Sequence, residues 1–397
     1  MAPDLQFDRP SAPSTDALAA AVGAAGAQHG WWHADLRWGQ TYARREIGAK
    51  RFTVVLESAT PPQRLCIVES FATEPDVQGV MQVCIKPKHL GWLRLTRFPW
   101  DAKMPSLGAV LADASDATVV RYRPGKRCTL RVSRGGGQAV FAKVFSDERG
   151  AAIYSAGIML WQARARGELA FEVAEPLGWD SARRTLWQGA VPGAPIAARL
   201  SDRSGVVLAL RMGRALASLA LAPSVRPGLH FDASGQQRRT QRCLDDLRRW
   251  LPASADAIAS LESTLHRAHA VVPQRELRVL HGAPHSQQWL EVDDDLGLVD
   301  FDRLSLGDAE LDVGTFLAEM DFENPRRFSV DRINAAFLEG YEAVAGRLDR
   351  RLLELYRGHK HLARAQRLAR SFKPDAGERA AWLIASVHER LNQIAAA

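Results

Sequence analysis

The sequence of 397 residues predicts an α+β fold of two lobes, preceded by an N-terminal α/β extension. Short β-rich runs fill the first half of the chain, and helical patterns fill most of the second half. Apolar residues make up 46% of the chain, which is enough for buried cores. Because a domain averages about 150 residues, this length favours more than one core. We therefore expect a sheet-rich lobe followed by a helical lobe.

The first part of the chain is expected to be a flexible tail at residues 1–16 and an extension at residues 17–117. Pro, Ser and Asp occur in the tail without periodicity, which is typical of loose segments. The extension contains strand-like runs separated by polar turns. These runs are Phe52–Glu57, Arg64–Phe71 and Trp92–Phe98.

A sheet-rich lobe is expected at residues 118–190. Its β-rich runs alternate with turn residues, and one helical stretch extends from about Glu148 to Arg166. The expected strands are Thr118–Tyr122, Cys128–Ser133, Ala139–Phe145, Phe171–Pro176 and Thr185–Gln188.

A helical lobe is expected at residues 191–397. Leucines and other apolar residues recur there at helical spacing, and three short apolar strands interrupt the pattern. The expected helices include Gly205–Leu221, Gln241–Leu251, Asp256–His269 and Leu348–Lys373, and the strands are Leu277–Leu280, Trp289–Val292 and Gly297–Val299.

Charge and cysteine content limit the function classes. A formal charge of +7 is compatible with an anionic partner such as a nucleotide, RNA or an acidic lipid surface, but also with solvated basic helices. The four cysteines are widely spaced, so neither a disulfide framework nor a zinc site is predicted. Without a signal-peptide pattern or a long uncharged apolar stretch, we expect a cytoplasmic protein with no membrane partner.

The most informative segment lies between residues 281 and 312. It reads HGAPHSQQWL at 281–290, then VDFD at 299–302, then Gly307-Asp308 and Asp312. This order and spacing resemble the aminoglycoside phosphotransferase family, whose catalytic loop reads HGD, four residues, then Asn, followed by a metal-binding Asp and GDxxxD. The resemblance implies a protein-kinase-like fold and covers roughly residues 118–330.

The family's pattern assigns roles to this loop, and it also shows where the chain departs from it. His281 and His285 match histidines of the loop, but Ala283 stands where the family has its catalytic Asp. Asp300 matches the metal-binding Asp, and Gln288 replaces the Asn that would be a second ligand of Mg²⁺. Carboxylate and amide oxygens both suit this hard cation.

Loss of the aspartate has a defined chemical cost. Removal of a general base typically slows a reaction by about 10²–10⁴-fold. His285 could replace it, although a structural role in the loop is the simpler interpretation. Asp302 is a nearby carboxylate for which loop ordering or a second metal contact is favoured over a role as base.

The resemblance also implies a nucleotide site in the sheet-rich lobe. Lys143, in the apolar run FAKVF, fits the strand lysine that contacts the α- and β-phosphates of ATP. Its expected partner is a Glu in the next helix, which residues 151–166 lack, so an edge-strand lysine facing water remains an alternative. Arg123 could contact phosphate from a covering turn, and Gln188 lies at the expected hinge between the lobes.

Two functions remain open at this point. One is a degenerate kinase (pseudokinase) that binds Mg-ATP and regulates or scaffolds a partner protein. The alternative is an active ATP-dependent phosphotransferase that acts on a hydroxyl of a small molecule. Nucleic-acid binding by the basic helices is a weaker third idea, because the sequence contains no recognition motif.

Overall fold

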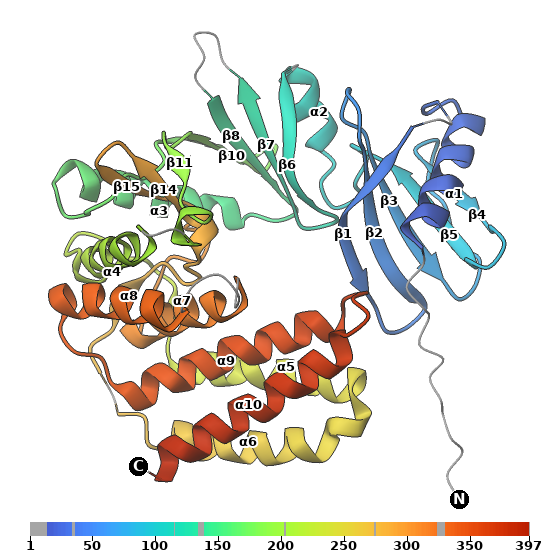
Figure 1. Ribbon diagram of the computed structural model, residues 1–397. Helices are drawn as coiled ribbons and strands as arrows, with labels where there is room; N and C mark the ends of the chain where they lie inside the picture. Colours follow the sequence, from blue (N-terminus) through green and yellow to red (C-terminus); the bar gives the residue numbers. More distant parts are fainter. Residues whose placement is uncertain are drawn as a thin grey trace, which may run out of the picture.

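Three bodies follow one another along the chain in Figure 1: an N-terminal sheet, a second sheet and a helical lobe. The computed structural model describes residues 14–33, 36–114, 116–133, 139–201, 204–273, 275–323 and 330–396. Most of the expected tail lies outside these residues, and its last two residues begin helix α1 (Thr15–Gln28). A two-lobed arrangement with an N-terminal extension is thus seen directly.

The N-terminal sheet has five antiparallel strands in the order β1-β2-β3-β5-β4. The three strands predicted in this region are confirmed, while β1 and β4 are additional. Their bounds are β1 Trp38–Arg45, β2 Lys50–Ser58, β3 Leu65–Phe71, β4 Gln82–Ile85 and β5 Trp92–Arg97.

Strand alternation explains why β2 and β3 are apolar at consecutive positions. Successive side chains point to opposite faces of a sheet, so a strand covered on both faces has no polar face. Val54 and Leu56 pack with α1, whereas Val55 packs toward the second sheet together with helix α2 (Leu107–Asp113). The extension is therefore joined to the next sheet by a shared apolar core.

The second sheet is also antiparallel, in the order β6-β7-β8-β10-β9. Helix α3 (Arg149–Ala165) follows β8 and packs beside the sheet, with strongest contacts to β9. The strands are β6 Ala117–Arg123, β7 Arg127–Ser133, β8 Ala139–Phe145, β9 Pro176–Asp180 and β10 Thr185–Gly189.

The strand expected at Phe171–Pro176 is wrong. Strand β9 begins only at Pro176, and the preceding segment forms a single bridge between Glu172 and Gly297. Phe171 and Val173 are apolar because they enter the core of the helical lobe, not because they belong to a sheet. The segment is a crossing between the lobes.

The helical lobe contains two apolar cores. One is formed mainly by α4, α7 and α8 with the short strands, and the other by α5, α6, α9 and α10. The predicted helices in this lobe are confirmed. The bounds are α4 Gly205–Leu221, α5 Ala233–Trp250, α6 Ala255–Ala270, α7 Ala309–Glu323, α8 Val330–Ala345, α9 Arg350–Ala369 and α10 Ala376–Ala396.

Short strands hold the segment between α6 and α7. They form two three-stranded sheets, β11-β14-β15 and β12-β16-β13. The strands predicted at 277–280, 289–292 and 297–299 are confirmed with small shifts of their ends. The bounds are β11 Ala194–Pro195, β12 His230–Phe231, β13 Arg278–Leu280, β14 Trp289–Val292, β15 Asp295–Leu298 and β16 Ser305–Gly307.

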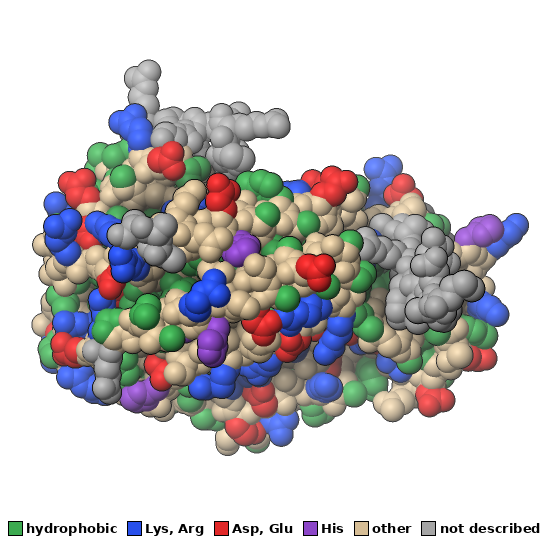
Figure 2. All heavy atoms as spheres, turned by 90° about the horizontal axis from the view of Figure 1, so that it is seen from below, with side chains coloured by type: hydrophobic (Ala, Val, Ile, Leu, Met, Phe, Trp, Pro, Cys, Tyr) green, Lys and Arg blue, Asp and Glu red, His purple; other side chains and the backbone are tan. Residues whose placement is uncertain are grey.

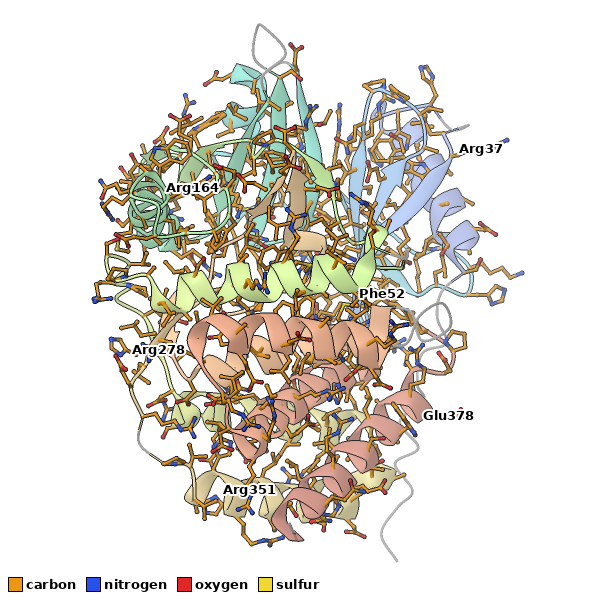
Figure 3. All side chains as sticks on the ribbon, turned by 60° about the vertical axis from the view of Figure 1, so that its left-hand side comes forward. Arg37, Phe52, Arg164, Arg278, Arg351 and Glu378 are labelled. Atoms are coloured by element: carbon orange, nitrogen blue, oxygen red, sulfur yellow. The ribbon has the colours of Figure 1, made fainter. Side chains whose placement is uncertain are left out.

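The extension also contacts the helical lobe. The backbone N–H of Arg45 on β1 donates to the carbonyl of Arg370, 2.9 Å away, just after α9. The rings of Phe52 and Phe372 pack edge to face with centroids 5.6 Å apart, and Figure 3 places Phe52 where the extension meets the helical lobe. The extension therefore bridges both lobes. Within the described residues, no helix combines the length and the apolar character needed to span a bilayer.

Candidate active site

The loop after β13 is fixed by a buried carboxylate. Asp312 on α7 accepts hydrogen bonds from the backbone N–H groups of His281 and Gly282, at 2.6 and 2.9 Å. Burial raises the pKa of Asp312 to about 7, although both hydrogen bonds act in the opposite direction. Gly282 has φ +83, and a Cβ there would lie 2.4 Å from the carbonyl oxygen of Arg303, so the loop requires glycine at this position.

His281 is a structural residue of the loop. Its ring is fully buried, lies 4.6 Å from the Phe301 ring centroid and has Nε2 3.0 Å from the carbonyl oxygen of Val299. Burial lowers the pKa of His281 to about 4, so the ring is neutral at pH 7. Because a carbonyl oxygen can only accept, we assign the ring proton to Nε2. His281 thus ties the loop to the segment that carries Asp300.

His285 and Gln288 cap a short 3₁₀ turn at Ser286–Gln288. The Gln288 side-chain oxygen accepts the backbone N–H of His285 at 3.0 Å, and the His285 ring accepts the backbone N–H of Gln288. A neutral imidazole has only one accepting nitrogen, so the lone pair that a general base needs is already engaged. The amide oxygen proposed as a metal ligand is likewise in use within the loop.

Ala283 follows Gly282 directly and is half-buried. Its methyl group can neither accept a proton nor orient a hydroxyl. Two carboxylates of the surrounding site have other partners: Asp312 holds the loop backbone, and Asp302 contacts two cations. No side chain of the loop from His281 to Gln288 supplies a carboxylate.

Four charged residues meet between the lobes, and we call them the interlobe charge cluster: Arg127, Lys143, Asp300 and Asp302. Lys143 Nζ lies 2.9 Å from Asp300 Oδ1 and 2.6 Å from Asp302 Oδ1. Arg127 contacts the other oxygen of Asp302 and lies 3.7 Å from Asp300 Oδ1. Lys143 sits on β8, the central strand of its sheet, so the edge-strand alternative is wrong. Its partners come from the helical lobe and not from α3.

Electrostatics of the cluster follow from burial and proximity. Burial acts to raise the pKa of Asp300, but Lys143 and Arg127 outweigh it and hold the pKa well below its usual range. Burial lowers the pKa of Lys143, and Asp300 opposes that shift. Asp300 also has φ +70, a conformation that is rare outside glycine and that clusters at functional sites.

An apolar cavity adjoins the cluster. Its enclosed volume is about 40 Å³, and Gln188 from the end of β10 lines it beside Lys143 and Asp300. This volume is below the roughly 300–1,000 Å³ of typical ligand pockets, so a nucleotide can enter only if the lining side chains or the lobes move. The other lining residues are largely apolar and suit a flat aromatic base: Ile153, Tyr154, Gly157, Leu160, Val173, Ala174, Pro176, Leu186, Val299, Phe301 and Asp302.

Arg123 lies elsewhere. It lines a second, larger cavity of about 470 Å³, which we call the basic cavity and which Gly282 also lines. The predicted site residues are therefore divided: Lys143, Gln188 and Asp300 line the apolar cavity, and Arg123 lines the basic cavity together with Gly282.

The residues around Asp300 suit Mg²⁺ in part. Asp300 and Asp302 place two carboxylates side by side, and Mg²⁺ is usually held by one or two carboxylates together with substrate phosphates. Lys143 and Arg127 now neutralise both groups, and Gln288 Oε1 is turned toward the loop backbone. Among the described residues, no group of three or more His, Cys, Asp and Glu side chains could hold a metal alone. A metal here would depend on phosphate oxygens for most of its ligands.

Sequence reasoning missed two parts of the site. Arg127 follows a turn of basic residues, but its pairing with Asp302, 175 positions away, leaves no local signal. The basic cavity combines arginines from α5, α9 and the segment after β15, which the chain separates widely. Only the basic composition of Gln241–Leu251 and Leu348–Lys373 hinted at it.

Comparison with known proteins identifies the family and the fold. The model of the phosphotransferase enzyme family (APH) matches residues 127–351, more than half of the chain. None of the curated proteins matches. Among solved structures, the amicoumacin kinase hAmiN in complex with AMP-PNP, Ca²⁺ and Ami is 12% identical, with a TM-score of 0.52 over 71% of this chain and 93% of that one.

Two further structures have similar coverage. A choline/ethanolamine kinase family protein from Mesorhizobium loti is 15% identical, with a TM-score of 0.50 over 74% of this chain and 100% of that one. An aminoglycoside-3'-phosphotransferase of type VIII is 22% identical, with a TM-score of 0.49 over 64% and 97%. At such identities, the amicoumacin and choline/ethanolamine kinase structures show the fold alone. The chain belongs to the phosphotransferase enzyme family and has its two-lobed, kinase-like fold.

Proposed function

We propose that this chain binds Mg-ATP between its lobes and is a degenerate kinase, slow or inactive in phosphoryl transfer. The contact of Lys143 with Asp300 carries the proposal. It brings a strand lysine, suited to the nucleotide phosphates, next to a carboxylate suited to the metal. The two residues are 157 positions apart, so only the folded lobes create this pair.

Binding requires the interlobe charge cluster to open. Phosphate oxygens would take the place of the carboxylates at Lys143, and Asp300 would turn to the metal. Arg127 would release Asp302 or remain against a phosphate. When bound, Mg²⁺ supplies positive charge that neutralises the phosphate oxygens. The protein's own contribution is to hold Lys143, Asp300 and the loop at Gly282 in fixed positions.

Transfer is the step that Ala283 impairs. The missing carboxylate would orient the acceptor hydroxyl and take its proton, and neither His285 nor Asp302 is free to do so. A nucleotide-binding protein that regulates or scaffolds a partner fits this arrangement. One observation favours the alternative of an active phosphotransferase: the basic cavity adjoins Gly282 and has room for a small hydroxylated acceptor.

Calorimetric titration with ATP tests the nucleotide site. The wild type should bind in the presence of Mg²⁺ with a dissociation constant below about 1 mM, and Asp300→Asn should weaken binding at least ~10-fold, about 1.4 kcal/mol. Asp300→Asn keeps the shape of the side chain but removes its charge. Asp256→Ala, an exposed carboxylate on α6, is the control and should bind like the wild type. An ATP affinity that changes neither when Mg²⁺ is removed nor in Asp300→Asn would refute the proposed site.

A further inference from the structure

The basic cavity is unusual in its charge. Its lining contains six cationic side chains, and none of the described lining residues is Asp or Glu. The cations come from the end of β6, from α5, from the segment after β15 and from α9. They are Arg123, Arg239, Arg242, Arg303, Lys360 and Arg367.

Most of these cations lack a carboxylate partner. Lys360 and Arg367 share Glu319, with distances of 2.9 and 3.3 Å. Within the described part of the chain, the other four make no ion pair. Asp308 approaches the cavity through the hydroxyl of Tyr356, and Asp300 acts on Arg123 and Arg303 from farther away. Six lining cations still leave an excess of positive charge in a concave space, which focuses the field.

The guanidinium groups are close enough to repel one another. Burial, followed by the charges of Arg239, Arg123 and Arg367, lowers the pKa of Arg303 to about 10. Burial and neighbouring arginines also lower the pKa of Arg123 and Arg239. All three remain charged at pH 7, and an anion between them would relieve the repulsion.

Charges of both signs are mixed on another face of the protein. The face seen from below in Figure 2 mixes Lys and Arg with Asp and Glu side chains across the helical lobe. Arg249, on the same helix as Arg239 and Arg242, has Asp246 3.7 Å away. The cavity therefore brings together four cations that have no ion pair among the described residues. A long nucleic acid would need an extended basic surface, whereas an open cavity of about 470 Å³ suits a small molecule.

The position of the cavity suggests its role. Gly282 lines it, and the next residue along the chain is Ala283, where the family has its catalytic Asp. Phosphoryl transfer needs the attacking oxygen of the acceptor and the leaving oxygen of the nucleotide roughly in line. If the apolar cavity holds the nucleotide, the basic cavity is the space on the acceptor side.

We propose that the basic cavity binds a small hydroxylated molecule carrying two or more phosphate or carboxylate groups. Its place on the acceptor side rests on the proposed function, but binding of the anion does not. Arginine recognises phosphate and carboxylate through paired N–H donors. The same charges exclude molecules that carry several ammonium groups.

Calorimetry with fructose 1,6-bisphosphate, citrate and pyrophosphate tests this inference, with fructose and spermidine as uncharged and cationic comparisons. At least one of the three anions should bind below about 1 mM, and neither comparison molecule should bind. Arg239→Gln and Arg303→Gln should each weaken anion binding at least ~10-fold, because each removes a charged hydrogen-bond donor to the anion. Arg239→Lys keeps the charge but lacks the paired donors, so it should weaken binding less than Arg239→Gln does.

Arg249→Gln is the matched control, since it removes an arginine of α5 outside the cavity, and it should bind like the wild type. Absence of binding for all three anions at 10 mM would overturn the inference. Anion binding by Arg303→Gln with the affinity of the wild type would also overturn it. So would a loss of affinity in Arg249→Gln as large as that in Arg303→Gln, because it would indicate a diffuse basic surface. Mg-ATP titrations of the same variants separate the two proposals: anion binding without Mg-ATP binding leaves this inference standing while the proposed function fails.

Discussion

Replacing Lys143 by Met removes the ammonium group that joins the two lobes. Met has a similar length and no charge, so it fills the buried space on β8 while leaving Asp300 and Asp302 with Arg127 alone. Breaking a buried ion pair by removing one partner costs roughly 3–5 kcal/mol. Asp300 is 31% exposed and Asp302 keeps Arg127, so we expect a loss near the lower limit, about 2–3 kcal/mol.

A double-mutant cycle isolates the contact. Lys143→Met, Asp300→Asn and the double variant would be unfolded with urea, and the coupling energy should be at least ~1 kcal/mol at pH 7. Because the pKa of Asp300 is lowered in the folded protein, its stabilising effect is fully present above the unfolded value of about 3.9. It is lost as the pH falls below that value toward the folded pKa. The coupling should therefore be unchanged between pH 7 and 5 and shrink below about pH 4.

The result that would refute this reasoning is a coupling energy near zero at pH 7. It would mean that Lys143 and Asp300 do not depend on each other in solution. A coupling that rises as the pH falls would equally contradict it, because protonation of Asp300 removes the charge that attracts Lys143.

Two other predictions concern the loop and the extension. Asp312→Asn should remove one of two hydrogen bonds to the loop backbone and cost about 1–3 kcal/mol of unfolding free energy. Burial raises the pKa of Asp312 to about 7, so the stabilisation contributed by the protonated carboxyl decreases as the pH rises from about 4 to 7. Urea unfolding of Asp312→Asn should therefore lack this part of the pH dependence of stability. A variant with the same pH dependence as the wild type would contradict the prediction. Phe52→Ala should lower the free energy of unfolding by about 3–5 kcal/mol. Val80→Ala is the control, because Val80 is exposed and its loss should hardly change stability. Hydrogen exchange should then speed up around Arg45 and Arg370, and unchanged protection there would show that the extension does not depend on this contact.

Local patterns predicted most of the secondary structure. Helix α4 has the predicted bounds, because its Ala- and Leu-rich run is periodic from end to end. The catalytic loop could also be placed, since the spacing from His281 to Asp312 is a property of one short segment. Phe171 shows the limit: an apolar crossing between lobes has the composition of a strand but lacks the neighbours that would make it one.

Contacts between distant segments could not be predicted. The partners of Lys143 were sought in the following helix, but they come from residues more than 150 positions away. Gln288 has the oxygen that a metal ligand needs, yet local geometry uses it to cap a turn. A single sequence does not reveal such a choice, because both uses require the same atom.

Phosphoryl transfer by Ala283→Asp tests the central claim most directly, namely that the nucleotide site is intact and only the base is missing. The variant would be assayed for Mg-ATP turnover beside the wild type and Ala283→Asn, which adds a polar group of the same shape without a base. We predict that Ala283→Asp raises turnover by about 10²–10⁴-fold, that Ala283→Asn does not, and that adding Asp300→Asn abolishes the gain. A folded Ala283→Asp variant that binds Mg-ATP like the wild type but gains no turnover would contradict the account.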